Sequence, residues 1–96
     1  MAVVLVHQGA GLTQQSYEEV VREVTGKTNP ESPADWPVEG LLVHAAGEGR
    51  DGFRVVDVWE SEEAARRLGE KLAPILQRTG ITAEPDIYSA HTFVSA

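Results

Sequence analysis

The feature that most constrains this sequence is a corner between Arg54 and Leu68, which reads RVVDVWESEEAARRL. Its first half is rich in β-branched and aromatic residues, which favour a packed strand: Val55, Val56, Val58 and Trp59. Ser61 follows directly and can cap a helix, and the acidic Glu62 and Glu63 would then lie near the positive end of the helix dipole. We therefore expect a strand that passes into a helix without an intervening loop.

Two other apolar runs predict strands at residues 2–7 and 40–46, and the segment 84–94 is expected to hold a last strand. The glycine-rich stretch 47–52 between the second run and the corner predicts a hairpin turn. Pro85 stands at the start of this last segment, where a missing backbone donor is tolerated.

A first helix is predicted from Thr13, as its N-cap, to Gly26, because apolar residues recur there with helical spacing at Tyr17, Val20, Val21 and Val24. The second helix has its predicted apolar stripe at Ala64, Ala65, Leu68 and Leu72. We expect Pro74 to kink or interrupt this helix and Gly80 to end it. Residues 28–37, with three prolines, predict a surface loop.

The predicted order β-α-β-β-α-β is that of a ferredoxin-like α+β fold, with a four-stranded antiparallel sheet and both helices on one sheet face. We expect residues 1–96 to form a single domain. Two helices cover one face only, yet neighbouring strand residues supply apolar side chains to both faces. The second face therefore predicts a homodimer that packs sheet against sheet.

Composition limits the classes of partner. Fifteen acidic residues against eight basic ones give a formal charge of −7, which disfavours nucleic acid and anionic membrane surfaces. Cysteine is absent, which excludes thiolate metal sites and thiol nucleophiles. Because no stretch resembles a signal peptide or a membrane span, we expect a cytoplasmic protein.

The layout, the strand GLLVHAAG at 40–47 and above all the segment VVDVWESEEA at 55–64 resemble the dimeric α+β barrel superfamily, specifically small antibiotic-biosynthesis-monooxygenase-like domains. This resemblance covers essentially the whole chain. It implies one of several activities: cofactor-independent oxygenation of aromatic polyketides, haem degradation or muconolactone-type isomerisation, and some members have no known activity. The haem-degrading members carry an asparagine near the end of strand one, where this chain has His7, and a tryptophan and a histidine on helix two, where it has Leu68 and no histidine. We therefore expect no haem and no other cofactor.

Four polar residues interrupt the apolar strands: His7, His44, Asp57 and His91. If the hairpin closes symmetrically, Ala46 lies opposite Phe53. One face of the hairpin then carries His44, Val55, Asp57 and Trp59, and the other carries Leu41, Val43, Val56 and Val58. A carboxylate beside an imidazole fixes its tautomer and raises its basicity, so His44 and Asp57 are the candidate catalytic pair for removing a phenol or enol proton.

The same two residues have a structural alternative, because a histidine and an aspartate on adjacent strands also serve as a paired interface contact in a dimer. Strand alternation alone does not say which face meets the helices. Tyr17 and Trp59 are predicted apolar walls of a pocket, with His7 and His91 as further substrate contacts. No metal site is expected, since the family's strand order 4-1-3-2 would separate the backbones of His7 and His44 by about 10 Å.

Two functions follow as hypotheses. The first is a cofactor-independent monooxygenase or isomerase for a small aromatic or polyketide-like molecule, with His44 and Asp57 as its base. The second is a non-catalytic dimeric protein that binds a ligand or assists another enzyme.

Overall fold

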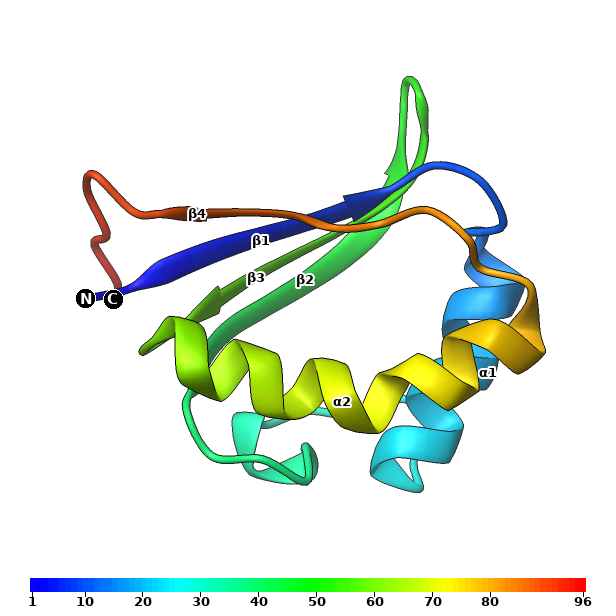
Figure 1. Ribbon diagram of the computed structural model, residues 1–96, viewed down its shortest axis with the longest axis horizontal. Helices are drawn as coiled ribbons and strands as arrows, with labels where there is room; N and C mark the ends of the chain where they lie inside the picture. Colours follow the sequence, from blue (N-terminus) through cyan, green and yellow to red (C-terminus); the bar gives the residue numbers. More distant parts are fainter.

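The computed structural model describes residues 1–96 and contains four strands, two α-helices and one short 3₁₀ helix (Figure 1). In chain order these are β1 (Val3–Gln8), α1 (Gln14–Thr25), η1 (Pro33–Asp35), β2 (Leu41–Gly49), β3 (Gly52–Trp59), α2 (Glu62–Thr79) and β4 (Asp86–Ser89). No helix is long and apolar enough to cross a bilayer.

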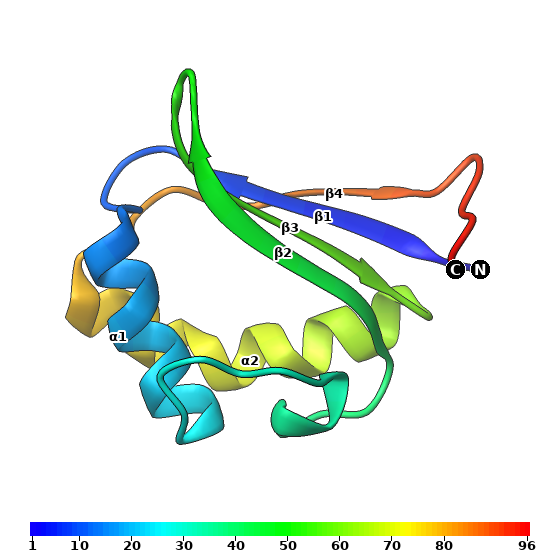
Figure 2. The same ribbon diagram turned by 180° about the vertical axis from the view of Figure 1, so that it is seen from behind.

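The strands form one antiparallel sheet in the order β2-β3-β1-β4. Figures 1 and 2 show both helices on the same side of this sheet, and the other side is left uncovered. The structure confirms the ferredoxin-like fold and the strand order expected from the resemblance.

The corner between β3 and α2 anchors one half of the core. Trp59 is 0 % exposed, the lowest value among the large side chains, and its cluster contains Val38, Leu41, Ala64, Ala65 and Leu68. Ser61 caps α2 by accepting a hydrogen bond from the amide of Ala64. The small Ala64 and Ala65 let the helix approach the indole closely, so the cap and the buried tryptophan together set the angle of α2.

A second apolar cluster lies at the other end of the sheet and joins α1 to α2. Its buried members are Leu12, Val20, Phe53, Val55 and Ile81. Thr13 caps α1 as predicted and forms a capping box with Ser16, and Gly26 ends the helix in the left-handed conformation at φ 76°. The space between the two clusters, under the middle of the sheet, is not filled by core side chains and holds the cavity described below.

The hairpin of β2 and β3 differs from the expected register. Its turn is tight, at residues 50–51, so Ala46 lies opposite Val55 and His44 lies opposite Asp57. The shift is an even number of residues, and for that reason His44 and Asp57 still share a face. A bulge between Leu41 and Val43 turns Leu41 inward, which corrects the prediction that Leu41 and Val43 share a face.

Two details refine the other predictions. Pro74 does not interrupt α2, which runs unbroken for 18 residues because its apolar stripe continues on both sides of the proline. The last strand lies within the predicted segment 84–94 and is only four residues long. β4 pairs with Val3 to Val6 of β1, and Ser89 lies opposite Val3, the first residue of β1. Beyond Ser89 one further bond joins the two segments, from the Ala90 amide to the Ala2 carbonyl.

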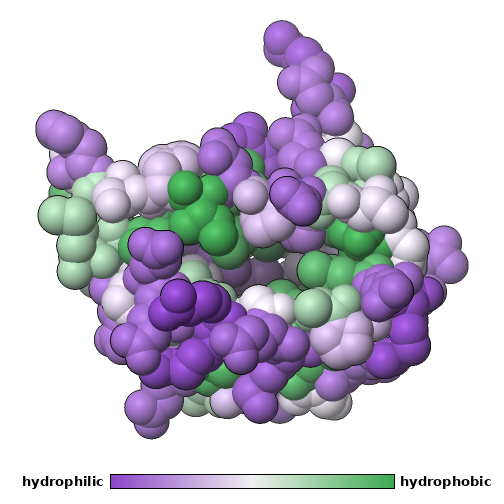
Figure 3. Space-filling model, in the orientation of Figure 1, coloured by the Kyte–Doolittle hydropathy of each residue, from purple (hydrophilic) through white to green (hydrophobic).

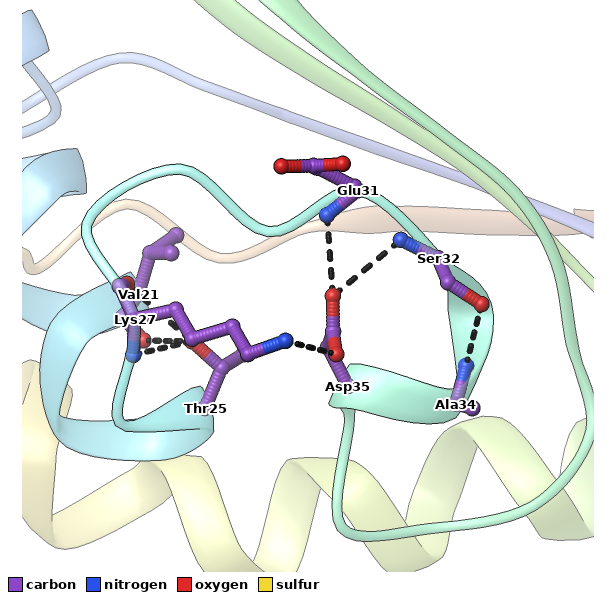
Figure 4. A network of polar contacts seen from close by, with 7 residues as sticks. All are labelled: Val21, Thr25, Lys27, Glu31, Ser32, Ala34 and Asp35. Atoms are coloured by element: carbon purple, nitrogen blue, oxygen red, sulfur yellow. Dashed lines mark hydrogen bonds and ion pairs between the residues drawn. The ribbon is translucent and has the colours of Figure 1, made fainter.

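The loop from Gly26 to Gly40 closes the helix side of β2 and is held by Asp35 (Figure 4). The Asp35 carboxylate accepts hydrogen bonds from the amides of Glu31 and Ser32 and pairs with Lys27 at 2.8 Å. These contacts lower the pKa of Asp35, with the Lys27 hydrogen bond as the largest cause. The same contacts place the next residue, Trp36, over the sheet.

Gly11 provides a test of this packing. A Cβ at Gly11 would lie 2.1 Å from the carbonyl oxygen of Gly80, and its φ of +85° is unfavourable for other residues. We expect Gly11→Ala to lower the free energy of unfolding by about 2 to 4 kcal/mol, from strain and lost contact between α1 and α2. Urea denaturation measures this, with Gly47→Ala as control, because a Cβ there meets nothing within 4 Å. Equal stability of the two variants would contradict the packing described.

Candidate active site

A cavity of about 410 Å³ lies between the inner face of the sheet and the two helices. Of the 22 residues that line it, 15 are hydrophobic. Figure 3 shows the hollow between the strands and α2, with apolar surface on both sides of it. Its volume falls within the roughly 300–1,000 Å³ of sites that bind small molecules.

Three polar side chains meet at the wall of this cavity and form one hydrogen-bonded series. The Tyr17 hydroxyl lies 2.6 Å from His44 Nε2, and His44 Nδ1 lies 2.6 Å from Asp57 Oδ1. Tyr17 comes from α1, His44 from β2 and Asp57 from β3, so the fold brings together residues that are far apart in sequence. We refer to these three residues as the triad.

Asp57 is buried, and both of its carboxylate oxygens have partners. Trp59 donates its indole N–H to Oδ2 at 3.3 Å, and Oδ1 faces the imidazole. With Asp57 as a carboxylate, His44 donates from Nδ1 and its Nε2 is left as the acceptor for the tyrosine proton. The triad therefore has one consistent set of donors and acceptors, in which Tyr17 Oη donates to His44 and accepts no hydrogen bond from the protein.

The phenol of Tyr17 is held in its neutral form. Burial raises the pKa of Tyr17 above its ordinary value, and the negative charge of Asp57 raises it further. The Tyr17 ring also packs against Phe53, with ring centroids 5.1 Å apart. At neutral pH the hydroxyl is therefore a proton donor to His44 rather than a phenolate.

Trp36 also belongs to the site and was not predicted from the sequence. Its indole lies against the His44 imidazole, with ring centroids 4.6 Å apart, and it lines the cavity. The only sequence signal was an aromatic residue beside Pro37 in an otherwise polar, proline-rich loop, and loop residues have no strand or helix period that would place them.

The other predicted residues lie in different surroundings. His7 lines the cavity, but its Nε2 lies 2.7 Å from the Ala83 carbonyl oxygen. Trp59 is enclosed in the core beneath Asp57 instead of forming a cavity wall. His91 lies exposed beyond β4, where it contacts Thr92, and does not line the cavity. No three His, Asp or Glu side chains lie together as metal ligands.

This arrangement can move a proton within an apolar space. A hydroxyl group that donates to Tyr17 Oη can lose its proton as Tyr17 passes its own to His44 Nε2. The resulting imidazolium would be stabilised by the buried Asp57 carboxylate. Strand alternation alone did not say which face of the sheet carries His44 and Asp57. The structure places both on the helix side, so they point away from the uncovered side.

The sequence matches no protein-family model and no curated protein. Several solved structures are similar in fold. A candidate monooxygenase from Shewanella loihica PV-4 is 16% identical over 96% of both chains, with a TM-score of 0.59. SnoaB, a cofactor-independent oxygenase from Streptomyces nogalater, is 17% identical over 99% of this chain and 98% of its own, also with a TM-score of 0.59.

The third structure is a monooxygenase from the gene ActVA-Orf6 of Streptomyces coelicolor, in complex with the ligand Nanaomycin D. It is 19% identical over 99% of this chain and 90% of its own, with a TM-score of 0.51. At these identities the likeness concerns the fold. The chain therefore shares the ferredoxin-like α+β fold of the antibiotic-biosynthesis-monooxygenase-like proteins that its sequence resembles.

Proposed function

We propose that the protein is a cofactor-independent monooxygenase for a phenolic or enolic polycyclic aromatic molecule. The observation that carries this proposal is the triad: an acid–base series of Tyr17, His44 and Asp57 at the wall of a largely apolar cavity. Tyr17 and His44 carry the proton: Tyr17 Oη receives it from the substrate, and His44 Nε2 receives the proton that Tyr17 releases. Asp57 is a positioning residue that sets the His44 tautomer.

The reaction begins with a proton transfer. The enol hydroxyl of an anthrone-like substrate donates to Tyr17 Oη, Tyr17 gives its proton to His44 Nε2, and Asp57 stabilises the imidazolium. The neutral phenol suits this role, because it is restored by the substrate proton and never needs to persist as an anion. The substrate leaves this step as an electron-rich enolate.

Molecular oxygen is the oxidant. The enolate carbon transfers an electron to O₂, and recombination forms a carbon–oxygen bond and a peroxide anion. Loss of the remaining hydrogen from that carbon, with cleavage of the O–O bond, gives a ketone and hydroxide. The proton held on His44 then converts hydroxide to water. The balance is CH₂ plus O₂ to C=O plus H₂O, and it requires no metal or organic cofactor.

The comparisons support this proposal at the level of fold. SnoaB is a cofactor-independent oxygenase, and the ActVA-Orf6 monooxygenase was crystallised with Nanaomycin D. The apolar walls suit a flat aromatic ring system, and Trp36 and Tyr17 offer stacking surfaces beside the base.

The triad predicts the effect of three conservative substitutions. We expect Tyr17→Phe, His44→Gln and Asp57→Asn each to lower kcat/KM for a hydroxylated anthrone by about 10² to 10⁴-fold, because each breaks the proton series. Oxygen consumption and quinone absorbance measure the rate above spontaneous oxidation. His91→Gln is the matched control and should retain the parent rate, because His91 lies outside the cavity.

Folded variants that convert the anthrone as fast as the parent protein would overturn the catalytic proposal. If the parent binds the anthrone or its quinone without converting it, the second function is favoured, a non-catalytic ligand-binding protein. Circular dichroism establishes that each variant is folded, and Tyr17→Phe, which removes a single oxygen atom, is the least disruptive of the three.

Tyr17 also predicts how stability depends on pH. Its pKa is raised in the folded state, so the folded protein holds this proton more tightly than the unfolded chain does. Its contribution to stability is present below the ordinary pKa of 10.0 and is lost as the pH rises through the folded value. We expect the parent to lose more stability than Tyr17→Phe as urea midpoints are measured from neutral pH to above 10.0. Parallel plots of urea midpoint against pH for the parent and Tyr17→Phe would contradict this expectation.

The uncovered side of the sheet supports a homodimer as part of the proposal. Side chains of β1, β3 and β2 alternate, so the residues between the cavity-lining ones point outward. Val4 lies beside Val58, Val6 beside Val56, and Ala45 on the other side of Val56. The outward residues form one apolar face: Val4, Val6, Val43, Ala45, Val56, Val58 and Tyr88. A second copy of this face would bury it.

Val56 lies at the centre of that face and provides the test. Sedimentation of the parent should give about twice 10.4 kDa at micromolar concentration. Val56→Glu should give the monomer mass, because a carboxylate at the centre of a sheet-to-sheet interface is costly to bury. Val56→Thr, of similar shape, should remain dimeric. A stable, folded monomer of the parent protein would refute the dimer.

A further inference from the structure

We propose that Arg66 recognises a carboxylate on the aromatic substrate at the opening of the cavity, and that the substrate is therefore a phenolic or enolic aromatic acid. This inference rests on the proposed function, because it names the substrate class for the same cavity. It concerns a residue that lies on α2, outside the triad.

The opening lies between α2 and β4. Residues that line the cavity at helical spacing along the exposed side of α2 are Glu62, Arg66, Gly69 and Ala73. Pro85 and Ile87 line it from the opposite side, and both are exposed. Figure 3 shows the hollow between these two elements. A molecule that reaches the triad through this opening passes Arg66.

Arg66 is the only lysine or arginine that lines the cavity. Three of the eight lysines and arginines have carboxylate partners: Lys27 pairs with Asp35, Arg67 with Glu63, and Arg78 with Glu23. Arg66 forms no ion pair within 4.0 Å, although Glu62 stands four residues before it on the same helix. Its guanidinium is thus available to a ligand, and a planar carboxylate is the partner that it binds through two parallel hydrogen bonds.

Gly69 is consistent with an opening at this place. A glycine inside a helix destabilises it relative to alanine, and a Cβ added here would meet nothing within 4 Å. Packing therefore does not require a glycine. Its effect, one turn beyond Arg66, is to leave the edge of the opening without a side chain.

The charges of the site match the two ends of such a substrate. The triad at the inner wall receives a hydroxyl proton, and the apolar lining takes the rings. The rest of the protein repels an acid, since its formal charge is −7 and Glu62 lies at the same edge. A carboxylate is tolerated only where Arg66 offsets this field, so removal of Arg66 should penalise an acid and leave a neutral analogue almost unaffected.

The test uses a dihydroxyanthraquinone carboxylic acid and its methyl ester, with binding followed by quenching of tryptophan fluorescence. The parent should bind the acid about three- to tenfold more tightly than the ester, as a partly solvated arginine–carboxylate contact would give. Arg66→Gln should reverse this order by weakening the acid alone. Arg67→Gln is the matched control, because Arg67 is adjacent, exposed and paired with Glu63, and does not line the cavity.

Added salt separates the electrostatic contribution to binding from the contribution of shape. Raising the ionic strength should weaken binding of the acid to the parent and leave the ester unchanged. If the acid and the ester bind the parent equally, or if Arg66→Gln weakens both alike, the carboxylate inference is overturned while the cavity proposal stands. If neither compound binds the parent, both proposals fail together. Gly69→Leu should slow association of both compounds, since it places a side chain in the opening.

Discussion

The buried carboxylate of Asp57 is the interaction on which the rest of the structure depends. One of its oxygens accepts the indole proton of Trp59 and the other accepts from His44. A buried charge is costly unless its acceptors are filled, and here one partner belongs to the core and the other to the cavity. Core packing at the corner of β3 and α2 holds Trp59, Trp59 holds Asp57, and Asp57 in turn fixes the orientation of the His44 imidazole.

Proteins of this size have little apolar surface to spare, which makes the cavity informative. The two core clusters lie at either end of the sheet, around Trp59 and around Phe53, and the space between them is left to the cavity. Filling that space would increase the stability of so small a domain. Its presence beside the hydrogen-bonded triad is the feature on which the proposed ligand site rests.

Much of the fold could be predicted from local signals. The caps at Thr13 and Ser61 and the glycines that end both helices appear in the sequence as single residues with a known backbone role. His44 and Asp57 were placed on one face because strand alternation survives an even error in register. Three features depend on tertiary contacts and could not be predicted. These are the bulge that turns Leu41 inward, the position of His44 and Asp57 on the helix side of the sheet, and the packing of Trp36 against His44.

The loop that carries Trp36 has a consequence for how such a site can change. His44 and Asp57 stand on paired strands, but Trp36 of the cavity wall stands on residues 26–40, which are secured mainly by Asp35 and its partners. Substitutions in that loop can reshape the wall without altering the register of β2 and β3. Under the proposed function, this loop contributes to substrate preference and the paired strands carry the proton acceptor, so a descendant could acquire a new substrate while inheriting the same chemistry.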